Sequence, residues 1–147
     1  MIDHVHKLIF LHIPKTGGTS ITAALMGSNI NSKNETEEKH WDANRCRDEY
    51  NEFWDNYMKF TVVRNPWSRM YSFYNYFKNV ETRSDVYGSD MSFKDWLISA
   101  LGGKIAEPWG GFGSQIDFIS CNGKVQVDHI LKFENLESDF NKLCKKL

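Results

Sequence analysis

The segment from Leu8 to Ile21, LIFLHIPKTGGTSI, constrains the fold more than any other part of this sequence. Its composition predicts an apolar strand over 8–13, a loop with one lysine and two glycines over 14–18, and a helix over 19–27. Glycines let a backbone approach an anion closely, and the N–H groups at the start of a helix point toward it. The segment therefore predicts a strand, a phosphate-binding loop and a helix in succession.

This loop differs from the P-loop of nucleotide triphosphatases, in which the lysine follows the glycines. Here Lys15 precedes Gly17 and Gly18. No apolar strand ends in an aspartate suited to magnesium, since Asp128 lies at the start of its predicted strand at 127–132 and does not close it. The loop therefore favours a nucleotide whose transferring group needs no magnesium, and the sequence predicts no metal site.

A second segment, FTVVRNPWSRMYSFYNYF from residue 60, repeats the strand, turn and helix pattern. It predicts a strand over 58–63 and a helix from Pro66 to about Asn79, because proline fits the first helical turn. Arg64 and Ser72 are eight residues apart and are candidates to bind one phosphate, the arginine through a forked contact. The two segments thus each predict an anion site.

The motifs HIPKTGGTS at 12–20, RNPW at 64–67 with Ser72, and FENL at 133–136 resemble the sulfotransferases that use 3'-phosphoadenosine 5'-phosphosulfate (PAPS). The resemblance is to the branch that holds the carbohydrate sulfotransferases and their bacterial relatives. It implies that Lys15 contacts the sulfuryl group and stabilises the leaving 5'-phosphate, and that Arg64 and Ser72 hold the 3'-phosphate. The residues implied at the 5'-phosphate are Lys15, Thr16, Gly17, Gly18, Thr19 and Ser20.

Sulfuryl transfer to a hydroxyl also needs a general base, which near neutral pH is most often a histidine. His40 lies between the two phosphate motifs, just before predicted helical segments over about 42–56, and the family often carries a histidine in a similar Lys-His context. We therefore predict His40 as the base. The alternatives are that His40 is an ordinary surface histidine and that His12 is the base, although a structural hydrogen bond is another role for His12.

The rest of the chain completes an alternating order of strands and helices. Ser92 and Asp95 predict a helix cap, the run 102–113 predicts a glycine-rich flap, and a strand over 127–132 precedes a helix from about Asn135. This order predicts an α/β fold with a P-loop-like parallel sheet and helices on both faces. The polar loop at 28–39 is a candidate for acceptor contacts.

The composition limits the organisation and the partners of the protein. A length of 147 residues with 41% hydrophobic content predicts one domain over 1–147, and a net charge of −1 gives no field that favours nucleic acid. No apolar run is long enough to span a bilayer, and three cysteines without metal-ligand spacing predict free thiols and a cytoplasmic location. Family members usually continue beyond the FENL motif, so the chain is expected to be short at its C-terminus.

The predicted function is PAPS-dependent sulfuryl transfer to a hydroxyl of a small molecule or carbohydrate, with 3',5'-bisphosphoadenosine (PAP) as the second product. Two alternatives remain open from the sequence. A small nucleotide or metabolite kinase would require magnesium and ignore a 3'-phosphate, and a noncatalytic module would bind PAP or PAPS without turnover. The acceptor and the oligomeric state are not predicted.

Overall fold

The computed structural model describes residues 1–26, 40–79, 90–105 and 111–147, which form two compact units. The first unit comprises residues 1–63 and 114–147, and the second comprises residues 64–113. The predicted acceptor loop at 28–39 lies outside the described residues, as do residues 80–89 and residues 106–110 of the predicted flap. The prediction of a single domain is not tested by this division.

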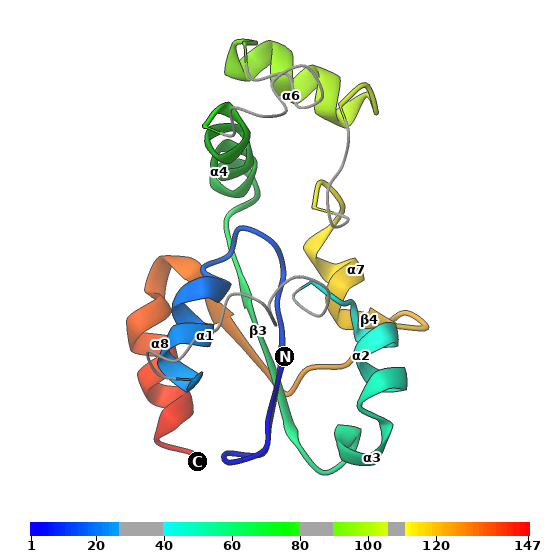
Figure 1. The fold of residues 1–147 in the computed structure, drawn as a ribbon, viewed down its shortest axis with the longest axis vertical. Coiled ribbons are helices and arrows are strands. Elements are labelled where there is room, and N and C mark those ends of the chain that lie inside the picture. The colour runs from blue at the N-terminus through cyan, green and yellow to red at the C-terminus, as the bar shows by residue number, and fades with distance from the viewer. Residues whose placement is uncertain (27–39, 80–89, 106–110) are drawn as a thin grey trace. The chain divides into compact units, whose positions relative to one another are not determined.

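The first unit is built on a four-stranded sheet in the order β1-β2-β3-β6 (Figure 1). Strands β2, β3 and β6 are parallel, with Phe10 opposite Phe60 and Phe60 opposite His129, while β1 joins β2 in the antiparallel direction. The strands are β1 (Ile2–Asp3), β2 (Leu8–Leu11), β3 (Met58–Val63) and β6 (His129–Lys132). The predicted α/β fold with a mainly parallel sheet is confirmed.

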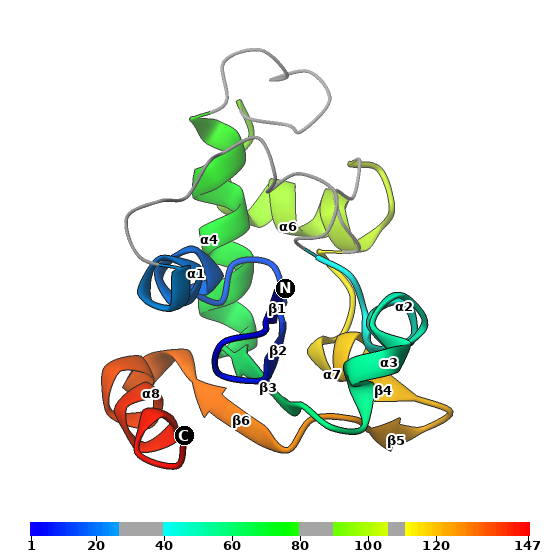
Figure 2. The ribbon, with the colours of Figure 1, turned by 60° about the horizontal axis from the view of Figure 1, so that its bottom comes forward.

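Helices cover both faces of this sheet, as predicted (Figures 1 and 2). Alternate side chains of β2 point to opposite faces because a strand has a two-residue period. Phe10 packs with Ile21 and Leu143 of α1 (Gly18–Met26) and α8 (Leu136–Cys144), and Ile9 packs on the other face with Cys46 of α2 (Ala43–Glu49). Helices α3 (Asn51–Trp54) and α7 (Gln115–Ile119) also contribute to this second face. Every residue of β2 is buried, which is typical of a central strand.

The second unit contains α4 (Pro66–Lys78) and α6 (Phe93–Leu101), which share a core of aromatic and small side chains. Asn65 caps α4 by accepting hydrogen bonds from the N–H groups of Trp67 and Ser68. The predicted cap of α6 is also present, since Ser92 Oγ accepts from the Asp95 amide and donates to the Asp95 carboxylate at 2.7 Å. The buried core residues of this unit are Met70, Phe73, Tyr74, Phe77, Trp96, Ala100 and Ile105.

The boundaries of several predicted elements differ from the structure. The predicted strand over 8–13 ends at Leu11, the strand over 127–132 begins at His129, and the helical stretch over 42–56 is interrupted at Tyr50 between α2 and α3. The sequence analysis missed β1, α7 and the hairpin of β4 (Ser120–Cys121) and β5 (Lys124–Val125). These elements have at most five residues, which is too short for a periodic pattern to identify them.

Asp139 of α8 is tied to the edge strand β6. Its carboxylate accepts the backbone N–H of Lys132 at 3.2 Å and pairs with Lys142 Nζ at 3.2 Å. The hydrogen bond from the Lys132 amide, followed by the one from Lys142, lowers the pKa of Asp139 below its ordinary value of 3.8. The hydrogen bond from Lys132 to Asp139 therefore links the end of β6 to α8 across the turn η3 (Phe133–Asn135).

We expect Asp139→Asn to weaken the pH dependence of the free energy of unfolding in the acid range. A carboxyl with a lowered pKa in the folded state stabilises the fold above the pKa of the unfolded chain, and this contribution is lost as the pH falls through the lower folded value. Urea unfolding at pH 7 and at several values below pH 4 measures the effect. The variant should be less stable than the wild type at pH 7, and the difference should narrow in acid; a constant difference would contradict the assignment.

Candidate functional site

The loop between β2 and α1 has a backbone shape that suits an anion. Lys15 and Gly17 have positive φ angles of 65° and 90°, and Thr16 between them does not. Alternation of this kind directs successive N–H groups into a concave nest. The Thr16 hydroxyl is buried and donates to the Ile13 carbonyl at 2.8 Å, so it fixes the loop rather than facing a ligand.

Helix α1 begins where the loop ends. The amides of Ser20 and Ile21 donate to the Gly17 carbonyl at 3.0 and 3.3 Å. The first N–H groups of any helix have no intrahelical acceptor, and Gly18 and Thr19 hold these positions in α1. The Thr19 and Ser20 side chains are exposed. The predicted 5'-phosphate residues therefore form one contiguous turn at the carboxyl end of β2.

His12 holds this turn close to the strand. Its side chain is only 6% exposed, and its ring stacks on Phe10 with centroids 5.3 Å apart. A Cβ atom on Gly18 would lie 1.8 Å from His12 Nε2, so no other residue fits at position 18 while the ring remains there. The glycine at this position is therefore required by the close approach of the His12 side chain.

Two residues of the FENL motif also pack against this loop. A Cβ on Gly17 would lie 3.0 Å from the Phe133 ring and 3.2 Å from the Leu136 side chain. Glu134 is exposed within η3, and the helix that follows is capped at Asn135 without a side-chain hydrogen bond. The motif therefore packs against the candidate phosphate loop through its two apolar residues.

His40 lies beside His12, at the candidate phosphate loop. Its Nδ1 is 3.1 Å from the His12 carbonyl oxygen, and the two rings have centroids 4.5 Å apart. A carbonyl oxygen can only accept, so Nδ1 carries the proton in this hydrogen bond and a neutral imidazole then has its lone pair on Nε2. This is the tautomer that a base acting through Nε2 needs.

The predicted 3'-phosphate residues belong to the second unit. Arg64 Nε donates to Ser68 Oγ at 3.2 Å, and the Ser68 hydroxyl donates to the Asn65 carbonyl at 3.1 Å. Ser72 follows one turn later on α4 and is half-buried. The sequence analysis missed Ser68, although its four-residue spacing from both Arg64 and Ser72 would have placed it on the same side of the helix.

Arg69 is a buried cation next to these residues. It is 3% exposed, and its two terminal nitrogens donate to the carbonyls of Gly111 and Gly113 at 2.6 and 3.2 Å. Its guanidinium also lies 5.5 Å from the Phe73 ring centroid. A buried cation needs such partners because desolvation is costly. Arg69 therefore joins the end of the glycine-rich segment to α4.

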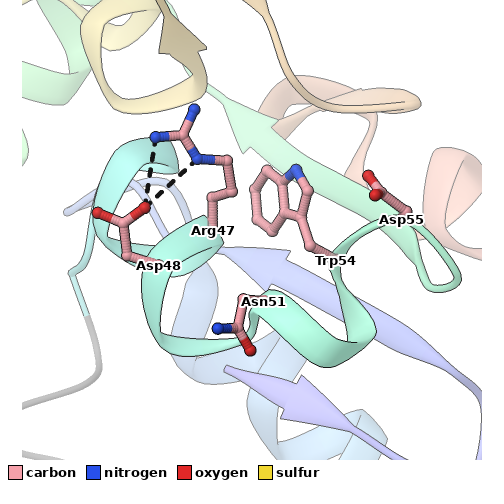
Figure 3. A pocket seen from close by; sticks show the side chains of 5 residues that line it. All are labelled: Arg47, Asp48, Asn51, Trp54 and Asp55. Atoms are coloured by element: carbon pink, nitrogen blue, oxygen red, sulfur yellow. Dashed lines mark hydrogen bonds and ion pairs between the residues drawn. The ribbon is translucent and has the colours of Figure 1, made fainter.

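A cavity of about 470 Å³ lies on α2 and α3 of the first unit (Figure 3). It contains none of the predicted site residues. Asp48 pairs with Arg47 at 3.3 Å and raises the pKa of that guanidinium, whose Nη1 also contacts Cys121 Sγ at 2.9 Å. The cavity is lined by Arg47, Asp48, Asn51, Trp54 and Asp55.

Residues 1–26, 40–79, 90–105 and 111–147 contain no group of three or more His, Cys, Asp or Glu side chains arranged to hold a metal ion. None of the helices in the same ranges has the length and hydrophobicity required to cross a membrane. The three cysteines are unbonded; Cys46 and Cys121 are buried and Cys144 is exposed.

We expect Gly18→Ala to destabilise the protein by about 1–3 kcal/mol or more, because the new methyl group overlaps the His12 ring. The double variant with His12→Ala provides the control, since removal of the ring opens the space that the methyl group needs. Urea unfolding of the wild type, both single variants and the double variant measures the coupling. If the two losses simply add, the proposed steric contact is wrong.

Comparison with known proteins identifies the family of the chain. A model of the sulfotransferase family matches residues 1–147. An uncharacterized protein of Archaeoglobus fulgidus is 32% identical over 93 residues, which cover 63% of this chain and 69% of the relative. No solved structure matches the chain. Because the family model spans the full sequence, the chain belongs to the sulfotransferase family.

Proposed function

We propose that the protein transfers a sulfuryl group from PAPS to an acceptor hydroxyl. The observation that carries this proposal is the nest at Lys15 and Gly17, bounded by Gly18 against His12, in a chain of the sulfotransferase family. The nest supplies backbone donors for the 5'-phosphate, as does the start of α1. The resemblance gives Lys15 the role of stabilising charge on the departing phosphate.

In this proposal His40 removes the proton from the acceptor hydroxyl. Its Nδ1–H is engaged by the His12 carbonyl at 3.1 Å, which supports a lone pair on Nε2 and a fixed ring orientation. The acceptor oxygen forms a bond to sulfur as the bond from sulfur to the 5'-phosphate oxygen breaks. The products are a sulfate ester and PAP, with the acceptor proton on His40.

Arg64 is the residue that would distinguish this donor from nucleotides without a 3'-phosphate. Its Nε donates to Ser68 Oγ at 3.2 Å, and this hydrogen bond holds the guanidinium at the first turn of α4. A guanidinium binds phosphate through paired, charge-assisted hydrogen bonds. Ser72 would add a hydroxyl donor to the same phosphate.

We expect Arg64→Ala to reduce the preference for PAP over 5'-AMP by about 10- to 150-fold, because charge-assisted hydrogen bonds contribute about 1.5–3 kcal/mol each. Calorimetric titration of PAP, 5'-AMP and ATP, with and without magnesium, measures this preference. Arg47→Ala, which removes a cation bound to Asp48, is the control and should retain it. Tight magnesium-dependent ATP binding without a preference for PAP would refute the sulfotransferase function and favour a kinase.

We expect His40→Ala and His40→Asn both to lower turnover by at least about 100-fold, a typical contribution of a general base. Asparagine can still donate to the His12 carbonyl but has no base at the Nε2 position, so it separates catalysis from local structure. Release of PAP from PAPS, measured with an acceptor alcohol, reports turnover, and PAP titration reports donor binding. Activity that is restored by asparagine would assign His40 a structural role.

A further inference from the structure

The cavity on α2 and α3 lies at the opposite end of the sheet from the phosphate loop. Asp55, which lines it, comes shortly before Met58, the first residue of β3, and Met58 pairs with Leu8 at the start of β2. The phosphate loop follows the other end of β2. The cavity volume of about 470 Å³ falls within the range of small-molecule sites. A ligand in this cavity would therefore be distinct from the sulfuryl donor.

Two side chains offer hydrogen-bond donors to the cavity. Trp54 is only 6% exposed, and its Nε1–H has no hydrogen bond within the described ranges. The buried side-chain atoms without a partner in those ranges comprise Trp41 Nε1 alone, so Trp54 Nε1 is accessible from the cavity that its indole lines (Figure 3). Arg47 donates one N–H from each guanidinium nitrogen, to Asp48 or Cys121, and its two terminal nitrogens each keep a second N–H.

The same cavity offers acceptors. The Asp55 carboxylate and the Asn51 amide are exposed, and neither has a hydrogen bond or ion pair in the part of the chain that the structure describes. Asp48 accepts from Arg47 through Oδ1 and keeps Oδ2 for another donor. The Asn51 amide can donate as well as accept. Unused donors and unused acceptors therefore line one cavity.

The donor groups are held in place without a ligand. Lys59 Nζ lies 5.4 Å from the Trp54 ring centroid and donates to the carbonyls of Trp54 and Tyr57 at 2.9 and 3.1 Å. The Arg47 guanidinium is fixed by the contacts of all three of its nitrogens. Side chains that are already ordered lose little conformational entropy when a ligand binds.

The mixture of donors and acceptors indicates the class of ligand. An anion would be repelled by the carboxylates of Asp48 and Asp55, and a cation would meet the Arg47 guanidinium and leave the Trp54 N–H unused. A hydroxyl group both donates and accepts, so adjacent hydroxyls can satisfy both kinds of group. We propose that this cavity binds a neutral carbohydrate, at a site separate from that of PAPS. The inference goes beyond the proposed transfer, since it concerns binding to the free chain.

The test follows the indole N–H of Trp54 by NMR. The full chain, labelled with nitrogen-15 and without nucleotide, is titrated with lactose, cellobiose and maltose, and Trp54→Phe identifies the Trp54 signal. We expect at least one of these neutral disaccharides to shift this signal in a saturable way. D-Glucosamine and D-glucuronate test the charge preference, and both should bind more weakly than the disaccharide.

Asp55→Ala should weaken binding of that disaccharide about tenfold or more, because it removes a charged acceptor. Asn56→Ala changes the adjacent exposed residue outside the cavity lining and should leave the affinity unchanged. The rest of the spectrum shows whether each variant is folded. No saturable shift with any of the three disaccharides, tighter binding of glucosamine or glucuronate, or full affinity in Asp55→Ala would overturn the inference. The sulfotransferase function is tested separately, by the preference for PAP over 5'-AMP.

Discussion

The imidazole of His12 occupies the space that a side chain at position 18 would need, and the candidate site in the first unit depends on this packing. The ring is fixed by stacking on Phe10, which is itself buried in the sheet. The loop can turn tightly toward α1 only because residue 18 has no Cβ. The same histidine presents its carbonyl to His40, so one strand end positions both the phosphate loop and the candidate base.

The loop between β2 and α1 packs against a segment that lies more than a hundred residues away in the sequence. Phe133 and Leu136 pack against Gly17, and Asp139 anchors the start of α8 to β6 around them. A phosphate loop must keep its N–H groups in position before the ligand arrives, because preorganised donors stabilise developing charge most effectively. The FENL motif therefore contributes rigidity to the loop through its apolar residues Phe133 and Leu136.

In the second unit, local hydrogen bonds hold the Arg64 side chain at the start of α4. Asn65 fixes the start of α4, and Ser68 connects the Arg64 guanidinium to the Asn65 carbonyl. Every contact in this group spans four residues or fewer. Local motifs of this kind are accessible from sequence, since proline at the first helical turn already predicted the helix start. The hydroxyl of Ser68 was missed because its spacing of four residues from Arg64 and from Ser72 was not considered.

The sequence by itself determined the strand, loop and helix around Lys15, the second such segment around Arg64, and the α/β class. Hydrophobic periodicity and the backbone preferences of glycine and proline act over a few residues and can be recognised locally. Tertiary structure decided which distant residues meet. The contact of His40 with the His12 carbonyl spans 28 residues, and the packing of Phe133 on Gly17 joins opposite ends of the chain. Such contacts depend on how the helices pack on the sheet, so no local pattern encodes them.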